Sequence, residues 1–333
     1  MYPESNRINN LVDTAKRVVI IQADNPDGDS LGSALALEEI LSDLGKSTYL
    51  YCSVDIPDYL KHIQGWDRVN KDLPSHFDIS IIVDTSAIVL LEKLEQSAQR
   101  RWVASKPVIV LDHHAGVHCD IPYASIVLND ADAVATGEVV YWLANELRWP
   151  INLQAKTHIT SAILADSLGL SSEGTTPRTY RIIADLLESG VNRTALEEAR
   201  RAFTKMPQQI FHYKSQLIQR TEFYADDRLA LVVIPHKELI EFSPLYNPAP
   251  LIQPDMLQTE QVQLAIVIKH YNDGKILGSI RANTGAAIAA KLAEYFGGGG
   301  HVFAAGFKTN DKSLEDVKST LITKAKELLD NKE

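Results

Sequence analysis

The chain has 333 residues, 45% of them hydrophobic and 23% charged, which is typical of a soluble globular protein with room for two domains. Its formal charge of −10 argues against a protein that coats long nucleic acid, although a local basic groove for a short ligand stays open. Cys52 and Cys119 are too few for a disulfide framework, and no apolar run or secretion signal is evident, so we expect a reducing, cytoplasmic location without a membrane span.

The first half of the chain alternates apolar runs with helical segments. Strands are expected over 18–21, 47–54, 78–86 and 107–114. Helices are expected over 8–15, 34–41, 135–147, 153–165 and 179–188. Continuous Val, Ile and Leu runs between helices are typical of a parallel sheet that is covered on both faces. The first half therefore predicts an α/β domain.

Metal-capable side chains follow three of these strands. Asp27 and Asp29 come after the first strand, Asp84 ends the third, and the triplet 112–114 (Asp-His-His) follows the fourth. A lone aspartate after a strand is most often a helix cap or a turn residue. Because the carboxyl ends of parallel strands share one edge, several such residues favour a metal or phosphate site there. Asp166, an acid at a helix carboxyl end where its charge is unfavourable, is expected at the same edge.

The second half begins with a charged helical stretch and continues with a different pattern. We expect strands over 229–234, 263–268 and 276–281, a hairpin turn over 272–275, a proline-rich loop over 243–254, and helices over 286–296 and 313–329. The predicted fold is thus an N-terminal α/β domain with a parallel sheet and a smaller α/β C-terminal domain with a mixed sheet. The expected boundaries are 1–192 for the first domain, 193–222 for a linker helix and 223–333 for the second domain.

Four consecutive glycines, 297–300, precede His301 and the compact run 304–306 (Ala-Ala-Gly). Glycines in a row are entropically costly to order, so one interpretation is a flexible linker. The compact sequence that follows favours the other, a loop whose backbone amides approach an anionic ligand.

Two motifs now occur on one chain: Asp-His-His at 112–114, and the glycine run with His301 followed by 304–306. With these motifs the chain resembles the DHH phosphoesterase superfamily, in its form with a DHH-associated C-terminal domain. It is most similar to the bacterial nanoRNases, which also remove the 3′ phosphate of phosphoadenosine phosphate. The resemblance implies a Mn²⁺-dependent phosphodiesterase that hydrolyses short single-stranded oligonucleotides or dinucleotides to mononucleotides. It implies no action on long duplexes, and a homodimer is common among similar proteins.

The resemblance also implies a ligand set for two Mn²⁺ ions in the first domain, with Mg²⁺ or Co²⁺ as open alternatives. Asp84 would bridge the ions, and Asp27 would bind the first ion with it. Asp29, His113 and Asp166 would complete the set for the second ion.

Further roles are implied for residues near the substrate. His114 would sit beside the reacting phosphate as a contact or an acid, and Asp112 would orient the histidines. The residues that resemble those holding the nucleotide and its phosphates are Arg281, Gly299, Gly300 and His301.

One position departs from the family pattern. Members usually carry a histidine four residues before the first aspartate of the first motif, and here that position is Ala23. Alanine cannot bind a metal, so the first ion is weakened unless Asp24, Asn25 or water substitutes. A nucleotide-binding protein with weak or lost catalysis is therefore one alternative function. A cyclic-dinucleotide phosphodiesterase is the other.

Overall fold

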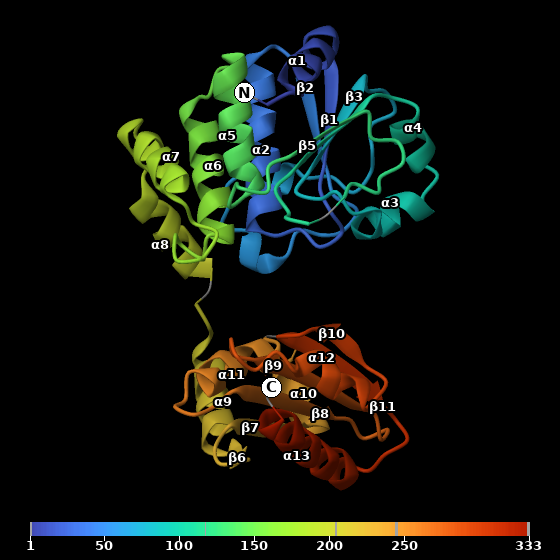
Figure 1. Ribbon diagram of the computed structural model, residues 1–333, viewed down its shortest axis with the longest axis vertical. Helices are drawn as coiled ribbons and strands as arrows, with labels where there is room; N and C mark the ends of the chain where they lie inside the picture. Colours follow the sequence, from blue (N-terminus) through green and yellow to red (C-terminus); the bar gives the residue numbers. More distant parts are fainter. Residues whose placement is uncertain (1, 117, 204, 244–245, 332–333) are drawn as a thin grey trace. The chain divides into compact units, whose positions relative to one another are not determined.

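The computed structural model describes residues 2–116, 118–203, 205–243 and 246–331. The chain forms two compact units, Met1–Lys205 (unit 1) and Met206–Glu333 (unit 2) (Figure 1). Each unit has its own sheet and its own hydrophobic core, so the two are described separately. Within the described residues, no helix is both long and apolar enough to cross a lipid bilayer.

Unit 1 is built on a five-stranded sheet in the order β2-β1-β3-β4-β5, and every pairing in it is parallel. The strands are β1 (Arg17–Ile21), β2 (Ser47–Tyr51), β3 (Ile79–Val83), β4 (Val108–Asp112) and β5 (Ile126–Asn129). Strands β3 and β4 are buried along their whole length, as expected for a parallel sheet covered on both faces. The parallel sheet is therefore confirmed, and β5 is an additional strand.

Alternate residues of each strand pack into two different cores. Ile20 and Ile81 face the core shared with α1 (Ser5–Thr14), α2 (Gly28–Asp43), α5 (Thr136–Leu147), α6 (Leu153–Asp166) and α7 (Pro177–Glu188). Val19 and Ile82 face a smaller core with α3 (Glu92–Gln96) and α4 (Arg100–Ala104) (Figure 1). The unit is thus a three-layer α/β domain, and short 3₁₀ turns η1 (Asp58–Leu60), η2 (Trp66–Arg68) and η3 (Ile88–Leu91) complete it.

Helices α2 and α6 pack unusually closely, and glycines make this possible. A Cβ atom on Gly32 would lie 2.9 Å from the carbonyl oxygen of His158, and one on Gly28 would lie 2.5 Å from Cβ of Ala165. Only glycine fits such an approach without a shift of the neighbouring helix. The start of α2 therefore lies against the end of α6, which brings Asp166 to the turn that carries the first two aspartates.

Unit 2 contains a six-stranded mixed sheet in the order β10-β11-β9-β8-β7-β6, in which only β7 and β8 pair in parallel. The strands are β6 (Glu222–Tyr224), β7 (Leu229–Pro235), β8 (Leu264–His270), β9 (Ile276–Ala282), β10 (Gly299–His301) and β11 (Ala304–Thr309). One face packs against α12 (Ala289–Glu294) and α13 (Leu314–Asp330). The other packs against α9 (Gln208–Gln219), α10 (His236–Phe242) and α11 (Pro248–Leu257). The expected hairpin turn joins β8 to β9.

Two expected segments differ from the structure. Part of the proline-rich segment 243–254 forms α11 instead of a loop, because Pro248 begins the helix, where a missing N–H costs no hydrogen bond. The stretch 193–222 is two helices, α8 (Arg193–Phe203) in unit 1 and α9 in unit 2. Pro207 caps α9 with an extended backbone, which is incompatible with one continuous helix.

Candidate active site

The acidic turn after β1 doubles as the N-terminus of α2. Oδ1 of Asp27 accepts hydrogen bonds from the backbone N–H groups of Asp29 (3.0 Å) and Ser30 (2.9 Å), and the Ser30 hydroxyl closes a capping box. Asp27 is therefore a helix cap, as is common for an aspartate after a strand. Because both bonds end on Oδ1, the second carboxylate oxygen of Asp27 remains for a ligand.

Asp29 is wholly buried and its carboxylate is fixed by donors from α5. It accepts the backbone N–H of Thr136 (2.6 Å) and of Gly137 (3.0 Å) and the hydroxyl of Ser33 (3.0 Å). The N-terminus of α5 thus supplies donors to a carboxylate on α2, in the manner of a helix anion site. This arrangement fixes where Asp29 points.

Asp84 follows β3 in a backbone conformation that few residues adopt. Its φ is +61°, in the left-handed region that aspartate tolerates better than most side chains. Its Oδ1 accepts the Thr136 hydroxyl at 3.1 Å. An unusual backbone held by the surrounding structure at a strand end is common at functional sites.

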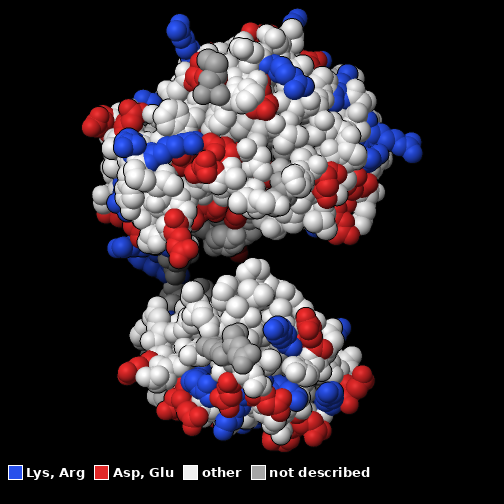
Figure 2. All heavy atoms as spheres, in the orientation of Figure 1, with Lys and Arg blue, Asp and Glu red and all other residues white. Residues whose placement is uncertain are grey.

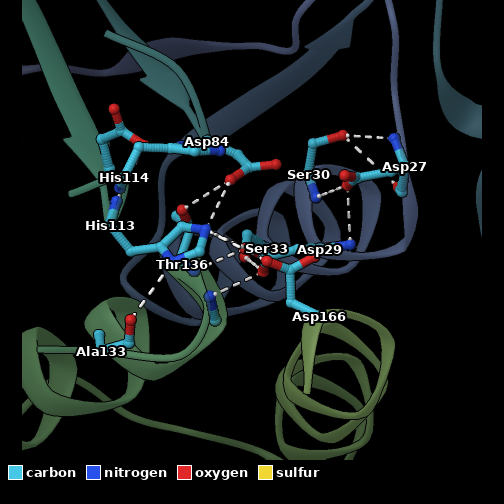
Figure 3. Close-up of polar contacts among 12 residues, drawn as sticks. Asp27, Asp29, Ser30, Ser33, Asp84, His113, His114, Ala133, Thr136 and Asp166 are labelled. Carbon is cyan, nitrogen blue, oxygen red and sulfur yellow. Dashed lines mark hydrogen bonds and ion pairs between the residues drawn. The ribbon is translucent and has the colours of Figure 1, made fainter. Parts of the chain in front are cut away.

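His113 lies at the centre of the cluster (Figure 3). Its Nε2 is 3.3 Å from Oδ2 of Asp166, 3.5 Å from Oδ1 of Asp84 and 3.6 Å from Oδ2 of Asp29. This buried nitrogen has no hydrogen-bond partner among the described residues. Its Nδ1 lies 3.3 Å from the carbonyl oxygen of Ala133, a geometry in which Nδ1–H donates and the Nε2 lone pair faces the carboxylates.

His114 lies close to Asp84 and His113. Its Nδ1 is 2.7 Å from Oδ1 of Asp112, which also accepts the backbone N–H of His113 at 2.8 Å. Asp112 is fully buried, whereas the His114 side chain is 49% exposed, so its other nitrogen is accessible to a ligand. The hydrogen bond that His114 donates to Asp112 raises the pKa of His114.

Two groups of side chains are close enough to hold a cation. Ligand atoms of Asp29, His113 and Asp166 lie within 4.8 Å of one another, and so do those of Asp84, His113 and His114. The structure therefore brings five of the expected residues together around one imidazole. Asp27 lies next to this cluster without joining either group.

Burial and the charges of neighbouring acids raise the pKa values of these carboxyl groups. Burial, followed by the charges of Asp29 and Asp27, raises the pKa of Asp166 to about 6. Burial also raises the pKa of Asp29, and burial and the Asp29 charge raise that of Asp84. Carboxylates in this state have lost water without gaining positive charge, which a divalent cation would supply.

Ala23, at the position of the family histidine, is 4% exposed, and its carbonyl accepts the Cys52 thiol. Asp24 is engaged elsewhere, because its carboxylate accepts the Lys93 backbone N–H at 2.8 Å and the Ser53 hydroxyl. Asn25 is exposed. Asp24 belongs to neither of the two groups of side chains that could hold a cation.

In unit 2, strand register aligns two of the expected substrate residues. Arg281 pairs with Ala304 across β9 and β11, and Ala304 pairs with His301 across β11 and β10. Side chains in one row share a face, so Arg281 and His301 flank a small alanine about 10 Å apart. Both are exposed.

The glycine run owes part of its composition to packing. Gly299 and Gly300 belong to β10, which corrects the expected loop, and Gly300 has φ +143°. A Cβ atom on Gly298 would lie 2.2 Å from the carbonyl of Gly306, and one on Gly300 would lie 2.6 Å from that of Ala304. The hairpin between β10 and β11 thus requires glycine at two positions. Gly299 is exposed and has open space around it.

Two parts of the chain match known protein families. Residues 17–168 match the DHH family, N-terminal domain, and residues 252–330 match the DHHA1 domain. The chain is 26% identical over 305 residues to the "Bifunctional oligoribonuclease and PAP phosphatase NrnA" of Thermus thermophilus, covering 92% of this chain and 88% of that protein.

Two further similarities extend this result. The "Cyclic-di-AMP phosphodiesterase PdeA" of Listeria monocytogenes is 23% identical, over 96% of this chain and 49% of that protein. The crystal structure of an exopolyphosphatase-related protein from Bacteroides fragilis superimposes with a TM-score of 0.81 at 20% identity, covering 98% of both chains. That likeness confirms the fold. The chain thus carries a DHH domain followed by a DHHA1 domain, and DHH family phosphoesterases are hydrolases that act on phosphodiester bonds.

Proposed function

We propose that this protein is a Mn²⁺-dependent phosphodiesterase that hydrolyses short single-stranded oligonucleotides and linear dinucleotides to mononucleotides, and that it also removes the 3′ phosphate of phosphoadenosine phosphate. The observation that carries the proposal is the buried Nε2 of His113, which has no hydrogen-bond partner in the described part of the chain and faces three carboxylates at 3.3 to 3.6 Å. The similarity to the Thermus protein, named as an oligoribonuclease and PAP phosphatase, supports the substrate class.

The residues fit a divalent cation. Asp29, His113 and Asp166 would hold one ion, and Asp84 with the second carboxylate oxygen of Asp27 would hold the other. Mixed carboxylate and imidazole donors suit Mn²⁺. Two such ions supply an activated water at neutral pH and offset charge on the phosphoryl oxygens.

The protein's own side chains would supply the other contacts to the substrate. Asp112 holds His114 by its Nδ1 and raises its pKa, which favours the form whose exposed edge would donate a hydrogen bond or a proton to the reacting phosphate. In unit 2, Arg281 and His301 present two donors on one face of the sheet, a spacing suited to a phosphate and its neighbour.

A specific observation favours a second candidate function. Ala23 is buried and Asp24 is engaged by Lys93 and Ser53, so under this alternative the first metal position would lack a nitrogen ligand. Under this alternative the protein binds short nucleotides and hydrolyses them slowly or not at all. Ala23→His separates the two: a large gain in hydrolysis from near zero favours the binding protein, and little change favours the enzyme.

The experiment that tests the proposal offers the purified protein several substrates with Mn²⁺, Mg²⁺ or Co²⁺. Substrates are RNA of two to five nucleotides, phosphoadenosine phosphate and cyclic diadenylate, the last because of the similarity to the Listeria enzyme. We expect mononucleotide release from the short RNA to be fastest with Mn²⁺. A preference for cyclic diadenylate would replace the substrate assignment, and no turnover with any metal would refute the enzyme.

A further inference from the structure

A long groove in unit 1 starts at the candidate active site and leads away from it. Its volume is about 1270 Å³, and its walls come from η1 and the residues after it, from α6, and from α8. Pockets for single small ligands have about 300 to 1,000 Å³, so the groove has room for more than one such group. All of its lining residues belong to unit 1.

One face of α6 forms the floor of the groove. The lining residues Leu153, Thr157, Ser161 and Leu164 follow one another at intervals of three or four, which places them on a single side of the helix. From Leu153 to Asp166 the helix axis advances by about 20 Å. A single strand with bases stacked at about 3.4 Å per nucleotide would place about six nucleotides along that length.

One end of the groove reaches two residues of the candidate metal site, Asp27 and Asp166. Asp27 and Gly28 line it from the start of α2, and Ala165 and Asp166 line it from the end of α6. These two segments touch, as the 2.5 Å approach of a Gly28 Cβ to Ala165 shows. A substrate whose phosphate is held at Asp166 therefore has the groove directly beside it.

The walls carry groups suited to a nucleotide chain. Tyr59 is 55% exposed, and its hydroxyl donates to the carbonyl of Pro26 at 3.3 Å, so the ring is tied to the acidic turn. Nδ1 of His62 lies 2.7 Å from the Tyr59 carbonyl. Aromatic and imidazole rings of this kind stack on bases without regard to sequence.

Helix α8 brings three arginines and two glutamates to the opposite wall. None of its described side chains is fully buried, and on the face seen in Figure 2 basic and acidic atoms both lie where Figure 1 draws this helix. Arg200 forms two hydrogen bonds to Glu197. Arg193 is exposed and has no ion pair or hydrogen bond within the described part of the chain, which leaves its guanidinium for a phosphate.

From these observations we infer that the groove is a binding track for the nucleotides beyond the scissile phosphate, with Tyr59 stacking on a base and Arg193 pairing with a phosphate. The inference rests on the proposed function. It adds that contacts in the groove would favour substrates of several nucleotides. A floor of about 20 Å limits the contacts to a handful of nucleotides, since longer strands gain nothing further from it.

The test measures equilibrium binding of a fluorescein-labelled pentaadenylate with phosphorothioate linkages, by anisotropy in the presence of Mn²⁺. The variant is the double substitution Tyr59→Ala and Arg193→Ala in the full chain. The matched control is Tyr180→Ala with Arg181→Ala, two exposed residues of α7 outside the groove. Circular dichroism confirms that each variant is folded, and Arg193→Gln alone serves as a milder second variant.

We expect the groove variant to raise the Kd of the pentamer about tenfold, which is the loss of one charge-assisted contact and one stacked base. The Kd of a dinucleotide should change less, and the control should change neither value. Equal Kd values for groove variant and control overturn the inference. Hydrolysis of bis(p-nitrophenyl) phosphate by wild type and groove variant is measured alongside. If the wild type does not hydrolyse this ester, the result counts against the proposed function. If both proteins hydrolyse it and the groove variant binds the pentamer as tightly as the wild type, the result counts only against the binding track.

Discussion

Removing the divalent metal should make the stability of unit 1 depend on the ionisation of Asp166. Burial and the neighbouring acids raise the pKa of Asp166 to about 6, whereas an aspartate in the unfolded chain titrates near 3.9. Between these values the folded metal-free protein holds a proton that the unfolded chain has lost. The free energy of unfolding contributed by Asp166 therefore falls as the pH rises from about 4 through about 6.

The size of this effect follows from the shift. A full difference of about two pKa units corresponds to about 3 kcal/mol, but the Asp166 side chain is 33% exposed, so solvent screening leaves about 1 to 2 kcal/mol. Mn²⁺ at a hundredfold excess over its Kd adds about 2.7 kcal/mol. For a domain of this size that gain raises the Tm by about 5 to 10 °C.

The assay compares wild type with Asp166→Asn by urea unfolding from pH 4 to 7.5, first with chelator and then with Mn²⁺. Without metal, Asp166→Asn should become progressively more stable than the wild type as the pH rises. With Mn²⁺ at pH 7.5 the order should reverse, because the variant has lost a ligand. Asp67→Asn, at an exposed position in η2, is the matched control. Parallel pH profiles of wild type and Asp166→Asn, or an equal gain from Mn²⁺, would refute the reasoning.

Three further predictions concern the supports of the site. Asp112→Asn should lower kcat/KM about 10- to 100-fold while Mn²⁺ content stays unchanged, because its histidine partner loses a charged acceptor at 2.7 Å; steady-state kinetics with metal analysis checks this. Arg178→Met should cost about 3 to 5 kcal/mol in urea unfolding, since Nε of Arg178 lies 2.7 Å from the fully buried carboxylate of Glu138; a second change, Glu138→Gln, should recover much of the loss. Gly28→Ala should cost about 1 to 3 kcal/mol by its clash with Ala165, and no rescue by Ala165→Gly would argue against the close approach of the helices.

Much of the fold was predictable because buried parallel strands are continuous apolar runs. The strands at 18–21, 78–86 and 107–114 were identified this way, and β1, β3 and β4 confirm them. Strand β5 was missed because only Ile126–Asn129 pairs, too short a run to stand out. The prolines of 243–254 predict a loop, but α11 forms in this segment because a proline at the first helical position is favourable.

The site could be anticipated only in part. Side chains at strand ends were predicted to converge because sheet topology places them on one edge, and the structure brings Asp29, Asp84 and His113 together. The groups that hold them in place were missed. The donor of Thr136 is a backbone N–H, which every residue type except proline has, and the acceptor of Ala133 is a backbone carbonyl, so no sequence signal marks either. The position of Thr136 at a helix start was the available clue.

The most direct test of the metal centre is the Mn²⁺ content per chain after equilibration and removal of loosely bound metal. Wild type and His113→Ala are measured side by side, because the imidazole of His113 belongs to both groups that could hold a cation. The account predicts at least one Mn²⁺ per wild-type chain, with most of it lost from His113→Ala. A wild-type chain that retains no Mn²⁺, or a variant that retains as much as the wild type, would contradict it.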